Sequence, residues 1–201
     1  MSLFLEIVWI IIAYLIGSVP VGVLLSRIKG KDPRMQGSGN IGATNVIRTV
    51  GKSIGIATLI GDALKGFLPV WFAIQFGWSD RMVAVVAFAA FFGHIFPIYL
   101  KLRGGKGVAT SLGIFLGLNY IAVLLDMAVF IGILLGWRIV SVGSIVAVIL
   151  MPIILFLLDT PVPYIAMAFG IAVFSCLKHK DNIKRLFAGT ENKIGRSKLT
   201  P

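Results

Sequence analysis

The sequence predicts an all-α integral membrane protein with seven transmembrane helices, and three observations support this prediction. Apolar residues make up 58% of the 201 residues and charged residues only 13%, whereas a typical soluble chain has about 25% charged residues. The apolar residues form long runs, and a helix needs roughly 20 of them to cross a bilayer. With seven helices, almost all Lys and Arg residues lie on one side of the membrane. Few residues remain outside the runs, so we expect a single transmembrane domain over residues 1–201.

The predicted spans follow one another with short connections. The first lacks the basic flank of a signal peptide, since its first charged residue is Glu6, and it is long enough to remain in the membrane. Gly93 and Pro97 are expected to bend the end of the third span. The spans are predicted at residues 3–25, 54–76, 82–100, 108–118, 121–136, 140–158 and 164–177.

The apolar stretch over residues 108–135 decides the number of spans. As one helix it would be about 42 Å long, more than the roughly 30 Å hydrocarbon core. As one tilted span it would leave 9 Lys and Arg residues on each side. A break near residues 117–120 places 17 of the 19 on one side, Arg81 on the other and Lys65 in the membrane. The positive-inside rule therefore predicts seven spans, with the N-terminus outside and the C-terminus in the cytoplasm. The net charge of +11 then indicates contact with anionic headgroups rather than a nucleic-acid partner.

The loop over residues 37–48 is polar and rich in glycine within an otherwise apolar sequence. Glycine has no Cβ, so backbone N–H groups can approach a ligand and form a concave nest for an anion. Arg48 adds a planar cation that suits phosphate. We interpret this loop as a phosphate cradle, although an ordinary polar connection between helices is the alternative. The candidate binding residues are Ser38, Gly39, Asn40, Gly42, Thr44 and Asn45.

A second basic, glycine-rich loop covers residues 101–107. A helix is expected to begin near Val108, so its N-terminal N–H groups point at the loop. Lys106 is the best-placed cation, between Gly105 and Gly107, with Gly104 beside them. Lys101 and Arg103 are interpreted as positive-inside anchors.

The C-terminal tail supplies a third group of candidates. If the last helix continues past Leu177, His179 and Asn182 lie on one face. Gly189 is a plausible helix stop, and the residues after it form a polar turn. Here the candidates are Thr190, Glu191 and Asn192. Ser144, near the cytoplasmic start of the sixth span, is a further candidate for contact with a substrate.

Polar residues also fall inside the predicted spans, where an unpaired charge costs about 3 kcal/mol. Asp62 and Lys65 are three residues apart and are expected to pair on one helix face. Asp126 lies in the fifth span, and His94 is expected to be a packing group beside the bend. The single cysteine, Cys176, excludes a disulfide within the chain, and no carboxylate pair or His cluster forms a credible metal site.

Three long motifs resemble those of the bacterial acyl-phosphate-dependent glycerol-3-phosphate acyltransferases, the PlsY family. The likeness covers nearly the whole chain, and the motifs occur in the family's order. It is carried by residues 37–45 (GSGNIGATN), 93–97 (GHIFP) with 104–110 (GGKGVAT), and 179–182 with 188–193 (AGTENK); residues 61–66 (GDALKG) also fit.

This resemblance implies an enzyme of the bacterial inner membrane with its active site on the cytoplasmic side. It implies transfer of an acyl chain from acyl phosphate, not acyl-CoA, to the sn-1 hydroxyl of glycerol 3-phosphate. The products would be lysophosphatidate, for phospholipid synthesis, and inorganic phosphate. Acyl phosphate is already activated, so no cofactor, metal or covalent nucleophile is required.

The expected roles follow from this reaction. The first loop holds one phosphate with Arg48 as counter-ion, and Lys106 stabilises charge on the other phosphate or on the leaving group. His179 and Asn182 orient the glycerol hydroxyl. Its proton goes either to His179 as general base or to a phosphate oxygen of the substrate.

Two other classes of function stay open from the sequence. A transporter of a phosphorylated metabolite would use the same basic loops together with Asp62, Lys65 and Asp126. The lack of a convincing inverted repeat and the gathering of polar motifs on one side count against it. A non-catalytic lipid-binding protein would have no need of glycine-rich loops.

Overall fold

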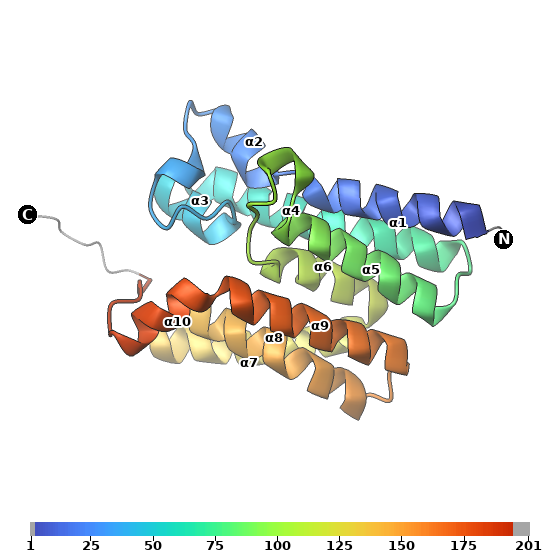
Figure 1. The fold of residues 1–201 in the computed structure, drawn as a ribbon. Helices are drawn as coiled ribbons and strands as arrows, with labels where there is room; N and C mark the ends of the chain where they lie inside the picture. Colours follow the sequence, from blue (N-terminus) through green and yellow to red (C-terminus); the bar gives the residue numbers. More distant parts are fainter. Residues whose placement is uncertain (1–2, 195–201) are drawn as a thin grey trace, which may run out of the picture.

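The computed structural model describes residues 3–194, and every element in this range is helical. Figure 1 shows the long helices side by side in two groups, with α1, α4, α5 and α6 in one and α7, α8 and α9 in the other. The two groups meet where α5 packs on α9 and α6 leads into α7. The helices are α1 (Leu3–Ser18), α2 (Val21–Arg27), α3 (Ala43–Thr49), α4 (Lys52–Gln75), α5 (Asp80–Ile95), α6 (Val108–Leu118), α7 (Tyr120–Trp137), α8 (Val140–Leu157), α9 (Val162–Lys178) and α10 (Lys180–Phe187), with short 3-10 turns at Pro33–Met35 and Ile98–Leu100.

Helix α5 forms the centre of the core, because its side chains are buried on several faces. Close contact with α1 depends on two glycines. A Cβ at Gly17 would meet the carbonyl of Ala90, and a Cβ at Gly93 would meet the carbonyl of Tyr14. The bend expected at the end of this helix is present: α5 ends at Ile95, and Pro97 begins the turn that leads to the second glycine-rich loop.

The first predicted span, at residues 3–25, consists of two helices rather than one continuous helix. Helix α1 ends at Ser18, α2 begins at Val21, and the two are bent by 41°. Pro20 explains the break, since it has no N–H group to continue the helical bonding. At the break, the carbonyl of Val19 accepts a 3.0 Å hydrogen bond from the N–H of Val21 and a 2.8 Å hydrogen bond from Nζ of Lys65 on α4.

The break predicted near residues 117–120 is observed between α6 and α7. Asn119 lies at the junction and caps α7, because its Oδ1 accepts a 3.0 Å hydrogen bond from the N–H of Ala122. Its Nδ2 lies 3.4 Å from Oγ1 of Thr160 in the turn between α8 and α9. The chain therefore reverses at Asn119, at the end of the molecule where α8 ends and α9 begins.

The helices have the length and composition of a multi-pass membrane protein. Within residues 3–194, four helical stretches are long and apolar enough to cross a membrane, or up to six if each of two bent pairs is one span. Helix α6, with 11 residues, is apolar but shorter. The bent pairs are α1 with α2 and α9 with α10, and the second is bent by 58° at His179.

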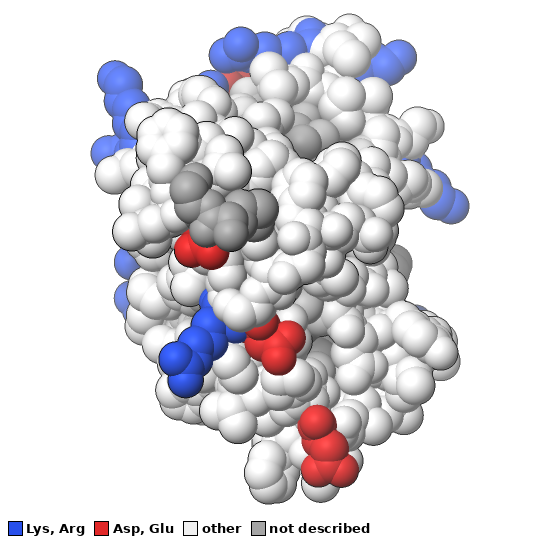
Figure 2. Space-filling view, turned by 90° about the vertical axis from the view of Figure 1, so that its right-hand side faces the viewer, with Lys and Arg blue, Asp and Glu red and all other residues white. Residues whose placement is uncertain are grey.

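The two ends of the bundle differ in charge. Figure 2 looks at the end where α1 begins, and acidic groups stand out there while most basic side chains lie at the rim of the view. The charged residues of this acidic end are Glu6, Asp80, Arg81 and Asp159. The opposite, basic end carries both glycine-rich loops, Arg138 and α10 (Figure 1).

Candidate functional site

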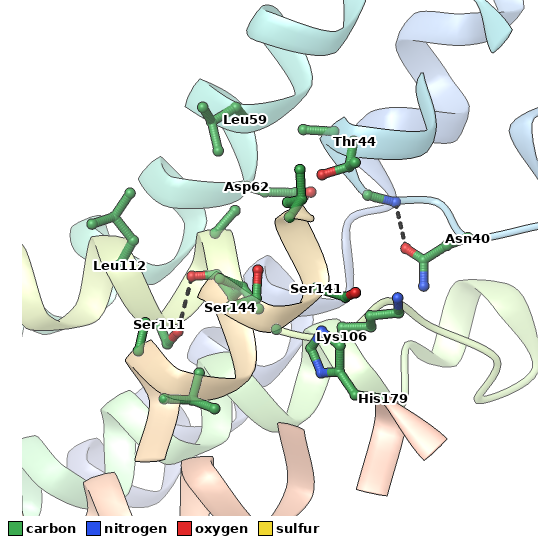
Figure 3. Close-up of a pocket in the computed structure, with 18 of the residues that line it drawn as sticks. Asn40, Thr44, Leu59, Asp62, Lys106, Ser111, Leu112, Ser141, Ser144 and His179 are labelled. Atoms are coloured by element: carbon green, nitrogen blue, oxygen red, sulfur yellow. Dashed lines mark hydrogen bonds between the residues drawn. The ribbon is translucent and has the colours of Figure 1, made fainter. Parts of the chain in front are cut away.

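A cavity of about 350 Å³ opens among the elements of the basic end and runs between the helices (Figure 3). Its outer part is lined by polar side chains and its inner part by apolar ones. The polar lining of the outer part includes Ser38, Asn40, Thr44, Asn45, Arg48, Lys106, Ser141, Ser144, His179, Asn182, Arg185 and Glu191, and Asp62, His94, Ser111 and Asp126 also line the cavity. The apolar lining comes from α4, α6, α7 and α8 and includes Leu59, Leu112, Phe115, Met127, Phe130, Ala147, Val148 and Met151.

Asn45 builds the first glycine-rich loop. Its side chain is buried, and its Nδ2 donates to the carbonyls of Pro33 and Asn40 at 2.8 Å and of Gln36 at 3.1 Å. Its Oδ1 accepts a 2.9 Å hydrogen bond from the N–H of Ser38. The amide of Asn45 is thus used within the loop, so direct contact of this amide with a substrate stays a prediction.

The other polar groups of this loop face the cavity. Oδ1 of Asn40 accepts a 2.8 Å hydrogen bond from the N–H of Gly42 at the start of α3, which fixes the Asn40 side chain (Figure 3). Arg48, on α3, also lines the cavity. Burial lowers the pKa of the Arg48 guanidinium, although Arg remains charged at neutral pH.

The second glycine-rich loop packs tightly against α5. A Cβ at Gly105 would collide with Nε2 of His94, and the N–H of Gly105 donates a 3.2 Å hydrogen bond to the carbonyl of His94. Gly107 has φ of +87°, which favours glycine, and a Cβ there would meet the ring of Phe91. These contacts fix the backbone on both sides of Lys106.

Lys106 is held in place by α9 and α10. Oγ of Ser175 donates a 3.0 Å hydrogen bond to the carbonyl of Lys106, and Nζ of Lys106 donates to Oδ1 of Asn182. Asn182 in turn donates a 2.7 Å hydrogen bond from Nδ2 to Oε1 of Glu191. The ammonium group of Lys106 therefore faces the cavity at a fixed position.

Glu191 connects helices α8 and α10 at the site. Its Oε1 also accepts a 2.9 Å hydrogen bond from Ser141 of α8, and its Oε2 accepts a 2.7 Å bond from Nε of Arg185. Burial acts to raise the pKa of Glu191, but the hydrogen bonds from Asn182, Arg185 and Ser141 outweigh it and lower the pKa below the usual value. The carboxylate therefore stays charged at neutral pH.

His179 lies at the junction of α9 and α10, and Figure 3 shows it next to Lys106. Its Nδ1 is 2.8 Å from the carbonyl oxygen of Ser175. A carbonyl only accepts, so Nδ1 carries the proton and Nε2 keeps its lone pair. Burial and the nearby Lys106 ammonium lower the pKa of His179 to about 4, so the imidazole is neutral at pH 7. Burial and the charges of Arg185 and Arg48 lower the pKa of Lys106 to about 8.

A second polar cluster lies deeper, between α4 and α5. Nζ of Lys65 lies 2.9 Å from Oδ1 of Asp62, which confirms the predicted pair. Nδ1 of His94 lies 3.7 Å from the same oxygen and has no hydrogen-bond partner among the described residues, so His94 is not the satisfied packing group that we expected. Asp62 and His94 both border the cavity.

Most of the predicted site residues meet at this cavity, although their spacing in the chain is large. Lys106, His179, Asn182 and Arg48 all line it, as do Ser38, Asn40, Gly42, Thr44, Asn45, Gly107, Ser144 and Glu191. Five predicted residues lie outside the lining: Gly39, Gly104, Gly105, Thr190 and Asn192. Within residues 3–194, no group of three or more His, Cys, Asp or Glu residues could hold a metal ion.

Arg185 is the main polar residue that the sequence reasoning missed. It lies three residues after Asn182, so helical spacing alone could have placed both on the face that meets the cavity. The apolar lining was also missed. It comes mainly from four helices that are apolar on most of their faces, so no local pattern distinguishes the apolar residues that face the cavity from those that face lipid.

The model of one protein family, described as glycerol-3-phosphate acyltransferase, matches residues 7–189. The chain belongs to the glycerol-3-phosphate acyltransferase family. A relative of this name from Geobacter sulfurreducens is 49% identical over 94% of this chain and 97% of its own length. Another, from Trichlorobacter lovleyi, is 50% identical over 92% of this chain and 96% of its own.

Two crystal structures from the family resemble the fold over nearly its whole length. Both are of PlsY, an integral membrane glycerol 3-phosphate acyltransferase. The glycerol 3-phosphate form has a TM-score of 0.92 and 38% identity, and it covers 94% of this chain and 96% of that chain. The lysophosphatidic acid form has a TM-score of 0.89 and 37% identity, covering 94% and 95%.

Proposed function

We propose that the protein transfers an acyl chain from acyl phosphate to the sn-1 hydroxyl of glycerol 3-phosphate, giving lysophosphatidate and inorganic phosphate for phospholipid synthesis. One observation carries this proposal: a single cavity joins a cationic, hydrogen-bonding mouth to an apolar interior. Such a cavity fits a donor with a phosphate head and a hydrocarbon tail, together with a small phosphorylated acceptor. Membership of the acyltransferase family supports the same reaction.

In the proposed mechanism, the sn-1 oxygen of glycerol 3-phosphate attacks the acyl carbonyl carbon. The bond from that carbon to the phosphate oxygen then breaks, and inorganic phosphate leaves. The hydroxyl proton goes to Nε2 of His179, which has a free lone pair, or to a phosphate oxygen of the substrate. In both routes the proton lost by the hydroxyl has an acceptor, and the variant His179→Ala distinguishes between them.

The cations of the site would serve the two phosphates. Arg48, with the backbone and side chains of residues 38–45, holds one phosphate. Lys106 stabilises negative charge on the other phosphate or on the leaving group, and Asn182 and Glu191 keep its ammonium in position. Fixed charges in a partly buried site act strongly on the transition state, so positioning can supply much of the catalysis.

We also propose the placement of this site in the cell. The strong difference in charge between the two ends supports seven spans, with α6 as a short one, the N-terminus outside and the C-terminus in the cytoplasm. The cavity then opens on the cytoplasmic side of the bacterial inner membrane. There it meets a soluble acceptor from water and an acyl chain from the bilayer, within one domain over residues 1–201.

A direct test uses purified protein, a long-chain acyl phosphate and glycerol 3-phosphate without added metal. We expect equal amounts of lysophosphatidate and inorganic phosphate. Lys106→Ala should abolish most turnover. Arg103→Ala, in the same loop but exposed and outside the cavity lining, is the matched control and should keep normal rates.

Absence of product from folded protein in every detergent and lipid tested would overturn the proposal. A transporter of glycerol 3-phosphate would instead take up the labelled metabolite into vesicles without forming product. Near-normal rates in Lys106→Ala would remove Lys106 from the mechanism but leave the reaction itself in place.

A further inference from the structure

Asp126 on α7 is a carboxyl group inside the apolar part of the cavity. It lines the cavity beside Met127 and Phe130, and its Oδ1 is buried without a hydrogen-bond partner among the described residues. Buried polar atoms are nearly always paired, so an unpaired one in a native structure needs an explanation. Its position in a substrate cavity suggests that a ligand supplies the partner.

The other carboxylates of the cavity wall already have partners. Asp62 is paired with Lys65, and Glu191 accepts hydrogen bonds on both oxygens. Both of these carboxylates are held by basic or hydrogen-bonding side chains of the protein. Asp126 is the lining carboxyl, within residues 3–194, that has neither an ion pair nor a hydrogen bond.

The depth of Asp126 follows from the packing of α7 on α8. These helices are antiparallel neighbours, and a Cβ at Gly143 would lie 2.9 Å from Cδ2 of Phe130, so these two residues are level. Asp126 is four residues before Phe130 and Ala147 is four after Gly143. Asp126 thus lies about 6 Å, roughly one helical turn, deeper than the level of Gly143.

This depth places the carboxyl beside the first part of an acyl chain. If the donor's head group binds at the polar mouth, its first few carbons must pass the level of Asp126 as the chain enters the apolar interior. This step rests on the proposed function, because it takes the apolar part of the cavity as the place of the acyl chain.

We propose that Asp126 determines specificity by hydrogen-bonding a hydroxyl group carried by the acyl chain near its carbonyl end. A chain without a hydroxyl displaces water from the carboxyl and gives it no partner, which costs binding. A hydroxyl pairs with the carboxyl in either protonation state, because it can both donate and accept. The site therefore favours hydroxyacyl phosphates over unsubstituted ones of equal length.

The test compares kcat/KM for donors of equal chain length in one detergent. The donors are an unsubstituted acyl phosphate, three with a hydroxyl at the third, fifth or seventh carbon, and one with the hydroxyl next to the methyl end. For each hydroxylated donor, we divide its kcat/KM by the kcat/KM of the unsubstituted donor. In the wild type, this ratio should be highest for a hydroxyl at the third, fifth or seventh carbon. Asp126→Leu should lower that ratio at least tenfold, mainly by improving use of the unsubstituted donor. The methyl-end hydroxyl should show no such change.

Two further variants keep this test decisive. Asp126→Ala removes the carboxyl without adding bulk, and it gives the same comparison if the Leu variant does not fold. Asp159→Asn, an exposed residue of the acidic end outside the cavity lining, is the control and should leave every ratio unchanged.

The outcomes separate this inference from the proposed function. The role of Asp126 would be overturned if the kcat/KM ratios of Asp126→Leu and Asp126→Ala stayed within about twofold of the wild-type ratios at all hydroxyl positions. Turnover of the unsubstituted donor would in that case still support the proposed reaction. Failure of the wild type with every donor would overturn the reaction itself, and the inference with it.

Discussion

The ammonium group of Lys65 lies 2.9 Å from the carboxylate of Asp62, one turn earlier in α4. Both side chains are buried, and the same ammonium donates to the carbonyl of Val19 at the break between α1 and α2. The pair therefore links the interior of α4 to the point where the chain turns toward the first glycine-rich loop.

Removal of one member of this pair should destabilise the protein strongly. Lys65→Met leaves the buried Asp62 carboxyl without its ion-pair partner, so we expect a loss of about 3–5 kcal/mol, as for other broken buried pairs. Thermal unfolding in detergent measures the effect. The double variant Lys65→Met with Asp62→Leu should recover much of the stability, because it removes both charges. Equal unfolding temperatures for Lys65→Met and the wild type would show that the pair contributes little.

Lys106 should give the reaction an alkaline limit. Its pKa of about 8 means that the ammonium form predominates below that pH and is lost above it. If the cation is needed, kcat/KM should fall about tenfold per pH unit above this value. Lys106→Arg keeps its positive charge above pH 8, so its kcat/KM should not decline there, even if its absolute rate is lower. A decline that is the same in both proteins would assign it to another group.

Substitution of His179 should show whether this residue accepts the proton of the glycerol hydroxyl. Loss of a general base typically costs 10²–10⁴ in rate, so a decrease of less than about tenfold in His179→Ala would exclude this role. The acid side of the wild-type profile gives an independent measurement. With His179 as base, activity should persist down to its pKa of about 4, because the imidazole is neutral above that pH. A phosphate base would instead lose activity near its second pKa of about 6.

Gly105 should be intolerant of any side chain, although it lies outside the cavity lining. A Cβ at this position would collide with the imidazole of His94. Gly105→Ala should therefore displace the loop and lower kcat/KM, with an effect on Lys106 rather than on overall stability. The double variant Gly105→Ala with His94→Ala removes the obstacle, so its activity should exceed that expected from the sum of the single effects. Simple additivity would show that the contact with His94 does not position the loop.

The sequence predicts the broad arrangement of this fold well because charge and hydropathy act over whole helices. The break at Asn119 was predictable from the charge balance between the two ends. The break at Pro20 was missed because the uniform apolar run around it outweighed a single proline. The 58° bend at His179 carries no proline or glycine signal, and the contact of α10 with Lys106 joins residues 76 positions apart.

The site was predictable from the sequence only where its functional residues lie close together in the chain. The glycine-rich loops and the tail contain most of the polar lining, so local motifs identified Lys106, Arg48 and His179. The bond between Ser141 and Glu191 joins residues 50 positions apart, and no local pattern reports such a contact. Asn45 shows a further limit, because residue type alone did not show that its amide is used within the loop.

The order of elements along the chain has a consequence for biosynthesis. The apolar interior of the cavity is formed by α4, α6, α7 and α8, all of which are made before α10 and Glu191. Lys106 gains its partner Asn182 only when the last helix docks. A nascent chain still held by the insertion machinery can therefore assemble the apolar part of the cavity before Asn182 and Glu191, which complete its charged part, have been synthesised.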